Sequence, residues 1–403
     1  MISDLDVPLG KRIELARRRR GLSRAVLAGL VGRSAEWIRQ VERDERAVDR
    51  LSILLRLAEV LKISDVAGFL GSAMPQAPRR SAPQVQVNEL RELLYQPKLT
   101  REPAPADDDD GQLDHLRRDL AETWTGWQDS PNRYTITLRR LPALLRAIDE
   151  IADAGECADQ LIAGTYRLVS AVLRRIGDQP LALLAIERAV EAARRTGDPL
   201  AEITCAGGFA TTLLSLGFPD RARQLALSLL DELQTRVPAE SATEISVYGA
   251  MQLTAAEATA ADDDQVAAER LLDQARQTAA RLADDRNDYR TGFGPTDVEI
   301  HAVRIALTFG RSRHALRIAE TVDTGRIHAR ERRARHYITV AQAHSRESNT
   351  FGAIFSLLKA EEACPEEIRF SAEARDVVQD LLARDNALVR TDLWALAERS
   401  GLA

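Results

Sequence analysis

Apolar residues recur every three to four positions along two stretches of the chain, residues 1–71 and residues 112–403. This spacing is typical of amphipathic helices, because it places the apolar side chains on one face of each helix. In the first stretch the pattern predicts five short helices, at about 9–20, 24–30, 35–43, 51–61 and just after residue 64. We call this stretch the head, and we expect it to fold as a small helical domain.

The ends of these short helices carry recognisable signals. Ser23 and Ser34 stand at the positions of N-caps, where a hydroxyl oxygen accepts a hydrogen bond from a free amide of the first turn. Gly21 and Gly32 stand where the chain must turn sharply. The second and third helices of the head are therefore predicted to be separated by a tight turn.

The segment between the two periodic stretches, residues 72–111, has a different character. It contains six prolines and the acidic run 107–110, and it has too few apolar residues to form a core. We expect an extended linker here, with at most one short helix at about 88–96.

Residues 112–403 contain an internal repeat whose period varies between 38 and 47 residues. Each repeat is marked by an alanine, here called the lead alanine, and in four of five repeats a small residue stands twelve positions earlier. The lead alanines are Ala182, Ala222, Ala268, Ala315 and Ala353. The residues twelve positions earlier are Ser170, Ala210, Ala256, Val303 and Ala341. A glycine stands five positions before three of the lead alanines, at Gly177, Gly217 and Gly310.

This repeat predicts a stack of helical hairpins. Small residues at fixed positions let the two helices of a hairpin approach closely, and the glycine ends the first helix with a positive φ angle. Neighbouring hairpins must stack, because one hairpin alone cannot cover its apolar face. The pattern resembles tetratricopeptide repeats, which implies a right-handed superhelix, although these periods exceed the usual repeat length. A generic alanine-rich helical bundle is the alternative.

Composition agrees with a helical protein and indicates its surroundings. Only 4% of residues are aromatic, whereas 45% are hydrophobic and 29% charged. The three cysteines are far apart and cannot form a complete set of disulfides, and the N-terminus lacks a signal-peptide core. We therefore expect a soluble, cytoplasmic protein that does not contact a membrane.

Charge is distributed unequally between the two stretches. Residues 1–71 hold 14 Lys and Arg against 10 Asp and Glu, whereas the rest of the chain holds 41 against 51. The head therefore carries +4 and the rest −10, within a total of −6. A basic head on an acidic body is compatible with binding of nucleic acid by the head alone.

The run 21–43, GLSRAVLAGLVGRSAEWIRQVER, resembles the helix-turn-helix of the Cro/C1-repressor (XRE) family, and the similarity continues into LLRLAEVL at 54–61. The apolar, glycine and cap positions agree together. Arg24, Arg33 and Asp44 depart from the usual residues of that family. The expected fold is thus all-α, with a five-helix helix-turn-helix head followed by a tetratricopeptide-like superhelix.

The resemblance implies that the third helix enters the major groove of double-stranded DNA, the operator, with its N-terminal half against base edges. Arg, Gln and Glu side chains have the donors and acceptors that distinguish guanine, adenine and cytosine there. Residues near helix starts are suited to phosphates. The candidate DNA-binding residues are Ser23, Arg24, Arg33, Ser34, Ala35, Glu36, Arg39, Gln40 and Arg43. For the basic run Arg17 to Arg20, phosphate contact and a plain solvated face are both open. Trp37 is expected to pack within the head or near the backbone, and not to read a base.

No catalytic constellation is recognisable. The phosphate-loop, nucleophile-elbow and H-E-x-x-H motifs are absent from the sequence, so we expect no enzymatic activity and no cofactor. Five histidines lie on different predicted helices, a scatter that does not favour a metal site. They are His301, His314, His328, His336 and His344.

The register of the repeats predicts which side chains line the inner, concave face of the superhelix. The candidate ligand-binding residues are Arg167, Arg174, Thr211, Glu257, Arg304, Arg335 and Gln342, and Thr204 and Asp297 are expected on the same face. Such a polar, arginine-containing face suits an extended peptide, but an ordinary solvated face is an equal alternative.

A Cro-type head followed by tetratricopeptide-like repeats looks like the peptide-sensing regulators of the RRNPP group. That resemblance implies a homodimeric, sequence-specific transcriptional regulator whose repeat domain senses a signal peptide or another small ligand. Two alternatives remain open. The repeats could bind a partner protein, and the head could belong to an interaction scaffold that no longer contacts DNA.

Overall fold

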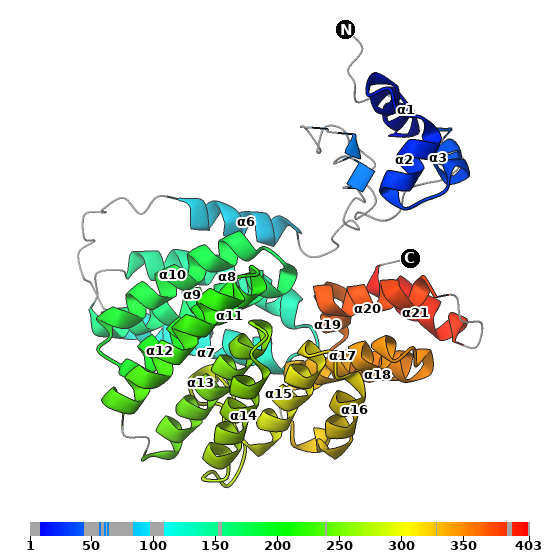
Figure 1. Ribbon diagram of the computed structural model, residues 1–403. Coiled ribbons are helices and arrows are strands. Elements are labelled where there is room, and N and C mark those ends of the chain that lie inside the picture. Colours follow the sequence, from blue (N-terminus) through cyan, green and yellow to red (C-terminus); the bar gives the residue numbers. More distant parts are fainter. Residues whose placement is uncertain are drawn as a thin grey trace. The chain divides into compact units, whose positions relative to one another are not determined.

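The computed structural model describes residues 9–43, 56–57, 60–61, 63, 84–96, 109–151, 155–237, 240–327, 329–384 and 389–401. The chain divides into two compact units, Met1–Arg80 and Ser81–Ala403, which we treat separately; the first contains the head, and we call the second the repeat unit (Figure 1). Within the described ranges both units consist of helices and turns, with one isolated β-bridge. The predicted all-α fold class is confirmed.

In the head, α1 (Leu9–Arg19), α2 (Arg24–Val31) and α3 (Ala35–Glu42) form at the predicted places. The Oγ of Ser23 accepts from the amide of Val26, and the Oγ of Ser34 accepts from the amide of Trp37. Both predicted N-caps are therefore confirmed. The three helices and residues further along the chain share a core of Ile13, Ala16, Leu27, Ala28, Ile38, Val41, Leu57 and Leu61. Most of the predicted fourth helix and all of the fifth lie outside the described residues.

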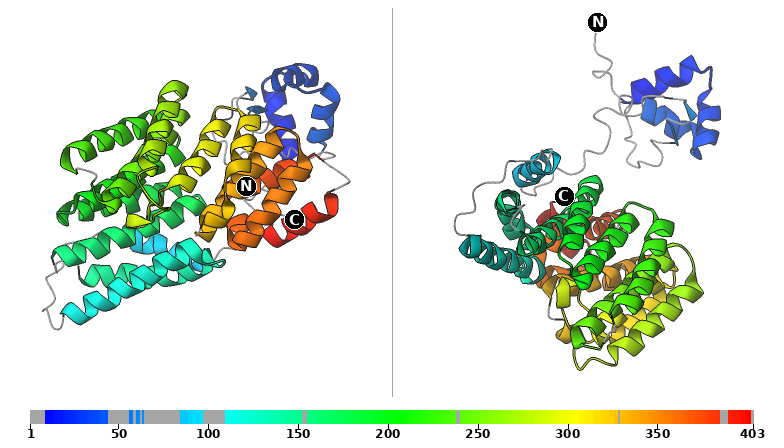
Figure 2. Two further views of the ribbon diagram at one scale, coloured as in Figure 1. Left: turned by 90° about the horizontal axis from the view of Figure 1, so that it is seen from below. Right: turned by 90° about the vertical axis from the view of Figure 1, so that its left-hand side faces the viewer.

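The repeat unit contains six antiparallel helical hairpins, within its described residues, that follow one another in a curved stack (Figures 1 and 2). The first helices of the hairpins are α7 (Asp109–Asp129), α9 (Glu156–Ile176), α11 (Pro199–Ser215), α13 (Ala242–Ala261), α15 (Pro295–Thr308) and α17 (Arg330–Arg346). The second helices are α8 (Arg133–Glu150), α10 (Gln179–Arg195), α12 (Pro219–Arg236), α14 (Gln265–Ala279), α16 (Ser312–Thr321) and α18 (Thr350–Ala363).

The predicted register holds in every hairpin that carries a lead alanine. All five lead alanines are fully buried, and the residues twelve positions earlier are at most 3% exposed. In the first of these hairpins the two positions touch directly, because the Ser170 hydroxyl donates to the carbonyl of Ala182 over 2.8 Å. The small residues therefore mark the places where the two helices of a hairpin approach most closely.

The position five residues before the lead alanine adopts a positive φ angle in all five hairpins. Gly177, Gly217 and Gly310 have φ values of 89°, 82° and 69°. The two repeats that lack the glycine have Asp263 and Ser348 there, with φ values of 63° and 58°. The turn geometry is thus conserved within the chain, even where a side chain must accept the left-handed conformation.

The segment expected to be a linker contains a helix of the repeat unit. In this segment α6 (Gln84–Tyr95) contributes Val87, Leu90 and Leu94 to the core shared with α8 and α10. Its apolar residues are spaced by three and four, and Arg188 of α10 donates to the carbonyl of Leu94 over 2.8 Å. The predicted helix at 88–96 is therefore longer, and it packs on the hairpins.

The longest period of the repeat arises from an insertion between α14 and α15. This insert, residues 280–294, contains the short 3₁₀ helix Asp288–Arg290 and an antiparallel bridge between Arg286 and Phe293. Tyr289 and Arg290 at its tip have positive φ angles of 46° and 58°. The insert folds into the inner side of the stack, where Phe293 is fully buried against Gly249 of α13. A second 3₁₀ helix, Thr324–Arg326, precedes α17.

The last helices, α19 (Pro365–Phe370), α20 (Ala372–Leu382) and α21 (Arg390–Ser400), bring the end of the stack against its beginning. A carboxylate oxygen of Glu366 accepts from the amides of Tyr134 and Thr135 at the start of α8, over 2.7 and 3.1 Å. Phe370 belongs to the core of the first hairpins, and α17 contacts α7. The first hairpin is thus joined to α19, which follows the last hairpin, by contacts between residues more than 230 positions apart.

Candidate functional site

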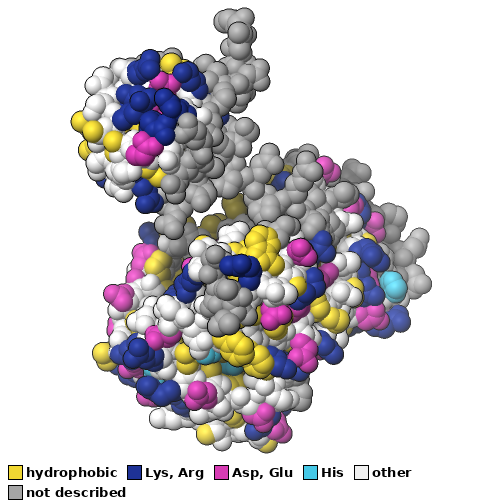
Figure 3. All heavy atoms as spheres, turned by 90° about the vertical axis from the view of Figure 1, so that its right-hand side faces the viewer, with side chains coloured by type: hydrophobic (Ala, Val, Ile, Leu, Met, Phe, Trp, Pro, Cys, Tyr) yellow, Lys and Arg dark blue, Asp and Glu magenta, His cyan; other side chains and the backbone are white. Residues whose placement is uncertain are grey.

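The outer face of α3 is the candidate DNA-binding surface. Ala35, Glu36 and Arg43 are exposed, and Arg39 and Gln40 are half-buried, whereas Ile38 and Val41 point into the core of the head. Lys and Arg side chains gather on one face of the head around acidic side chains (Figure 3). The described structure thus presents four predicted side chains of α3, and Arg43 directly after it, on the solvent side.

Three of these side chains contact one another. Both carboxylate oxygens of Glu36 accept from the Arg39 guanidinium, at distances of 2.6 to 2.9 Å. Gln40 donates to the same carboxylate over 3.4 Å. These charge-assisted bonds, the hydrogen bond from Arg39 above all, lower the pKa of Glu36. An exposed pair of this kind is weak, so Arg39 can exchange Glu36 for the acceptors of a base.

The basic run Arg17 to Arg20 is solvated only in part, because Arg18 and Arg20 are exposed whereas Arg17 is not. Arg17 is buried, and its guanidinium binds Glu42 at the end of α3, with Nε 2.5 Å from Oε1. Arg17 also donates to the carbonyl of Leu22 over 2.7 Å. Arg20 donates to the carbonyl of Val60. Helix packing explains the difference, since Arg17 lies one turn from Ile13 on the core side of α1.

The predicted phosphate-contacting residues near the starts of α2 and α3 are only partly free. The Nε of Arg24 lies 2.6 Å from Glu42, although about a third of its side chain is exposed. Arg33 is exposed and lies over the ring of Trp37 at 5.7 Å. The prediction that Trp37 packs within the head is confirmed, because its ring lies against the core. Asp44 lies outside the described residues.

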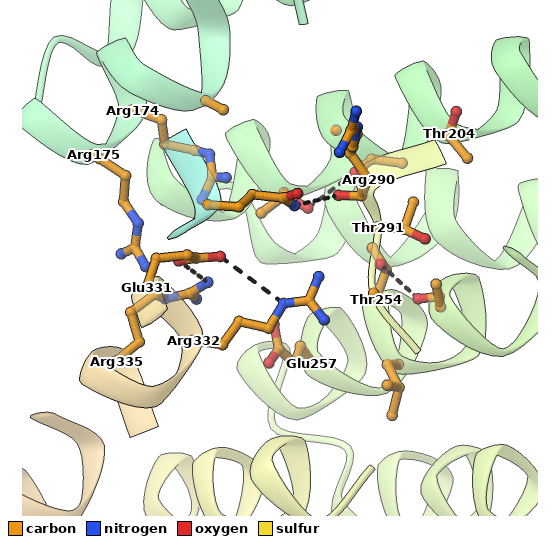
Figure 4. A pocket seen from close by; sticks show the side chains of 18 of the residues that line it. Arg174, Arg175, Thr204, Thr254, Glu257, Arg290, Thr291, Glu331, Arg332 and Arg335 are labelled. Carbon is orange, nitrogen blue, oxygen red and sulfur yellow. Dashed lines mark hydrogen bonds and ion pairs between the residues drawn. The ribbon is translucent and has the colours of Figure 1, made fainter. Parts of the chain in front are cut away.

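The second candidate site is a cavity of about 460 Å³ on the inner side of the repeat unit. It is lined by α7, α9, α11, α13, α15 and α17, with further side chains from α8, α10, the insert and α20. Figure 4 shows Arg174 and Arg175 of α9 extending toward Glu331 and Arg335 of α17. Side chains that are distant in sequence thus meet in one polar space.

The structure brings together six of the seven candidate ligand-binding residues. Arg167, Arg174, Thr211, Glu257, Arg304 and Arg335 all line the cavity, as do Thr204 and Asp297. Gln342 is not among the lining residues. It lies two helical turns beyond Arg335 on α17, and only the first turns of that helix border the cavity.

Other lining residues were not predicted. Arg175 follows the predicted Arg174 on α9, and Arg332 lies one turn before the predicted Arg335 on α17, so a wider helical face would have included both. Arg133 begins α8, a helix on which no residue was predicted. The insert contributes Arg290 and Thr291. The extra length of that repeat was the available signal, but length alone does not show that a loop folds inward.

Most arginines around the cavity are paired with carboxylates. Arg133 binds Glu367 at 2.8 Å and Glu331 at 3.4 Å, and it stacks on Trp127 with its guanidinium carbon 3.5 Å from the ring centre. Burial acts to lower the pKa of Arg133, but the two carboxylates outweigh it and raise the pKa. Arg304 binds Glu257 at 2.8 Å. Burial acts to raise the pKa of Glu257, but Arg304 and His301 outweigh it and lower the value to about 2.

Three arginines of the cavity, Arg167, Arg174 and Arg290, lack such a partner within the described residues. No carboxylate lies within ion-pair distance of the Arg174 guanidinium, and burial together with the neighbouring Arg175 lowers its pKa to about 10. Arg167 donates to the carbonyl of Tyr289 in the insert, and burial lowers its pKa. Positive charge in this cavity is therefore only partly balanced by the protein itself.

The histidines do not come together. Among the described residues no group of three or more His, Cys, Asp or Glu side chains is placed to hold a metal ion. His328 lies outside the described residues. Nor does any described helix combine the length and the apolar character needed to cross a bilayer.

Comparisons with known proteins bear mainly on the head. No curated protein sequence matches the chain. Bacillus thuringiensis PlcR, solved in complex with the peptide PapR7 and DNA, aligns at 11% identity with a TM-score of 0.34, over 85% of this chain and 98% of PlcR. TPR-like repeats of a Podospora anserina kinesin light chain align at 16% identity with a TM-score of 0.32, over 49% of this chain and 93% of that one. At these TM-scores neither alignment supports a functional argument. The family model of the helix-turn-helix domain matches residues 8–67, and the N-terminal part of the chain is a helix-turn-helix domain.

Proposed function

We propose that the protein is a sequence-specific, DNA-binding transcriptional regulator whose repeat unit binds a peptide or small ligand. The observation that carries the proposal is the packing of α3. Its apolar side is fixed in the core of the head, its first turn is capped by Ser34, and Arg39, Gln40 and Arg43 lie on the opposite side. A rigid helix with such an outer face matches the second helix of a helix-turn-helix in the major groove.

If α3 lies in the major groove of DNA, the candidate residues have different roles. Arg39 and Gln40 can donate to acceptors on base edges, whereas Glu36 can accept from cytosine and repel other bases. Ser23 and Arg33 stand near helix starts, where free amides and positive charge favour phosphates. Phosphate contacts release counterions, so DNA affinity should fall steeply as salt is added.

The ligand-binding half of the proposal rests on the inner cavity. A ligand there touches several hairpins at once, so it can favour one curvature of the repeat unit over another. It changes DNA binding only if it binds one arrangement better. The resemblance to peptide-sensing regulators implies a homodimer, and we include it in the proposal; a dimer would bind an operator with two half-sites.

The test is selection of duplexes from a random pool by the full-length protein, followed by affinity measurements at increasing salt. We expect one enriched motif, and loss of its selectivity in the Arg39→Ala, Gln40→Ala double variant. Arg221→Ala is the matched control, because Arg221 is an exposed arginine of α12 outside both sites. If the wild type ignores every duplex at low ionic strength, or if the double variant selects the same motif, the proposal is wrong.

One observation favours a protein partner for the repeat unit. Phe351 and Phe355 lie one turn apart on α18 and are 73% and 56% exposed, and Trp394 of α21 is 50% exposed. Exposed aromatic side chains of this kind are typical of interfaces. A second copy of the chain would cover them in the homodimer. Light scattering of the Phe355→Glu variant distinguishes a second copy of the chain from another protein. If this variant still forms a dimer, the aromatic face is not the dimer interface and is available to another protein.

A further inference from the structure

The insert determines how much of the inner face a ligand can reach. Its backbone and side chains contact several first helices: Arg167 of α9 donates to the carbonyl of Tyr289, and Gln128 of α7 accepts from Asn287 over 2.8 Å. The Tyr289 hydroxyl donates to Asp198 at the start of α11 over 2.7 Å. An extended peptide that followed the inner face from hairpin to hairpin would collide with this segment.

The space that remains is compact. A cavity of about 460 Å³ lies in the range of small-molecule pockets. The insert packs closely against α13 at Gly249, because a Cβ atom at this position would lie 2.0 Å from the Phe293 ring. Withdrawal of the insert would expose the fully buried Phe293 to water. The insert is therefore a wall of the cavity.

Positive charge exceeds negative charge around this space. Among the described residues that line the cavity, eight are arginines and four are carboxylates. A fifth carboxylate, Glu367, is not among the lining residues but pairs with Arg133 and Arg175. Arg174 and Arg290 have no carboxylate partner in the described chain, and Arg335 reaches Glu331 only at 3.8 Å. These three arginines come from α9, the insert and α17, so they approach a ligand from different directions.

Hydroxyl groups supply the complementary chemistry at the α11 and α13 side. Thr204, Thr211 and Thr254 line the cavity, and each donates its proton to a carbonyl of its own helix over 3.0 to 3.1 Å. A hydroxyl that donates in this way keeps its lone pairs for a ligand. The cavity therefore offers guanidinium donors at one side and hydroxyl acceptors at the other.

We infer that the cavity binds a compact phosphorylated molecule that also carries hydroxyl or amino groups, such as a nucleotide or a sugar phosphate, in place of an extended peptide. A phosphate has three acceptor oxygens and a charge near −2, so it can accept from guanidinium groups that come from several directions. The hydroxyl or amino groups of the same molecule donate to the hydroxyl oxygens of Thr204, Thr211 and Thr254. The inference deepens the proposed function, on which its regulatory meaning rests.

The experiment is calorimetric titration of the full-length protein, without DNA, with four probes. These are ATP, glucose 6-phosphate, inorganic pyrophosphate and an acidic octapeptide. We expect saturable binding of ATP or glucose 6-phosphate, weaker binding of pyrophosphate, which lacks donor groups, and no binding of the peptide. Arg174→Gln and Arg290→Gln should each weaken binding by about tenfold to a hundredfold, the usual effect of losing a charge-assisted hydrogen bond.

Arg221→Gln is again the control, and it should bind as the wild type does. Arg290 lies in the insert and outside every helix core, so its variant keeps the test valid if Arg174→Gln fails to fold. The inference is overturned if neither organic phosphate binds, if both cavity variants bind like the wild type, or if only the peptide binds. Because the titration contains no DNA, its failure is distinguishable from failure of the head to select a duplex.

Discussion

The head and the repeat unit use the same residue pairs in opposite ways. On α3 of the head, the Arg39–Glu36 pair is exposed and lies within one turn of helix. Between α8 and α19 of the repeat unit, the Arg133–Glu367 pair is fully buried and joins residues 234 positions apart. An exposed pair contributes little to stability and exchanges partners easily, whereas a buried pair that loses one partner leaves an uncompensated charge.

This difference separates recognition from architecture. Under the proposed function, a surface that binds DNA bases benefits from side chains that exchange partners at little cost. A cavity that must keep its shape benefits from side chains fixed by several neighbours. The head contains one buried exception, the group formed by Arg17, Arg24 and Glu42. Single substitutions in the two units test where each unit keeps its essential charges, and the buried positions should show the largest effects.

Glu367→Gln should destabilise the repeat unit most. It leaves Arg133 buried with only the longer contact to Glu331, and loss of one partner of a buried pair costs about 3–5 kcal/mol. Urea unfolding followed by circular dichroism measures the change. Glu373→Gln is the matched control, since Glu373 also pairs with Arg175 but its side chain is 55% exposed. Equal effects of the two variants would contradict the role given to burial.

Glu42→Gln makes the corresponding change in the head. It removes the charge that Arg17 and Arg24 share, and we expect a loss of about 3 kcal/mol, since the Arg24 side of the group is partly exposed. Hydrogen exchange should show faster exchange in α1 to α3 and no change in the hairpins. If Glu36→Gln on the surface of α3 destabilises the head equally, the contrast between buried and exposed pairs fails there.

His336 provides a test by pH. It is buried on α17, and burial lowers its pKa from 6.5 to about 4. The unfolded chain therefore binds this proton first as the pH falls, and stability that is complete above pH 6.5 is lost progressively down to about pH 4. The loss amounts to at most about 3 kcal/mol. His336→Leu should remove that part of the pH dependence in urea unfolding, and an unchanged profile would contradict it.

Ser34→Ala should have the smallest effect. It removes the hydroxyl that accepts from the Trp37 amide, which costs about 1 kcal/mol. Hydrogen exchange should show fraying of the first turn of α3 alone, the turn that carries Glu36. Ser34→Asp preserves the cap and should restore the protection. A variant without a cap but with unchanged exchange would mean that packing alone holds this turn.

Local signals in the sequence predicted most of the fold. Ser23 and Ser34 act as caps, the lead alanines are buried, and the register of the repeats placed Arg174 and Arg304 on one inner face. These predictions depend on residues close together in the chain, or on a pattern that repeats. Ser348 shows the limit, because its residue type does not indicate the left-handed turn that its position in the repeat requires, whereas Asp263 is of a type that accepts this conformation more readily.

The features that sequence did not predict depend on distant contacts. Arg17 is buried because Glu42 lies opposite it, and Arg133 is buried because Glu367 closes on it from the other end of the stack. The insert faces inward because Gly249 leaves room for Phe293. In each case one residue acquires its role from a partner that no local spacing identifies, so periodicity alone could not find it.

The contact between α19 and α8 alters how the repeat unit should come apart. Linear arrays can unravel from either terminus, because each hairpin is held only by its neighbours. Here α19, which follows the last hairpin, is bound to the first hairpin through Glu366 and Glu367, so neither end of the stack is free to unfold alone. Heat or urea should then unfold all six hairpins in a single cooperative step. If the contact between α19 and α8 is removed, the hairpins should unfold one after another.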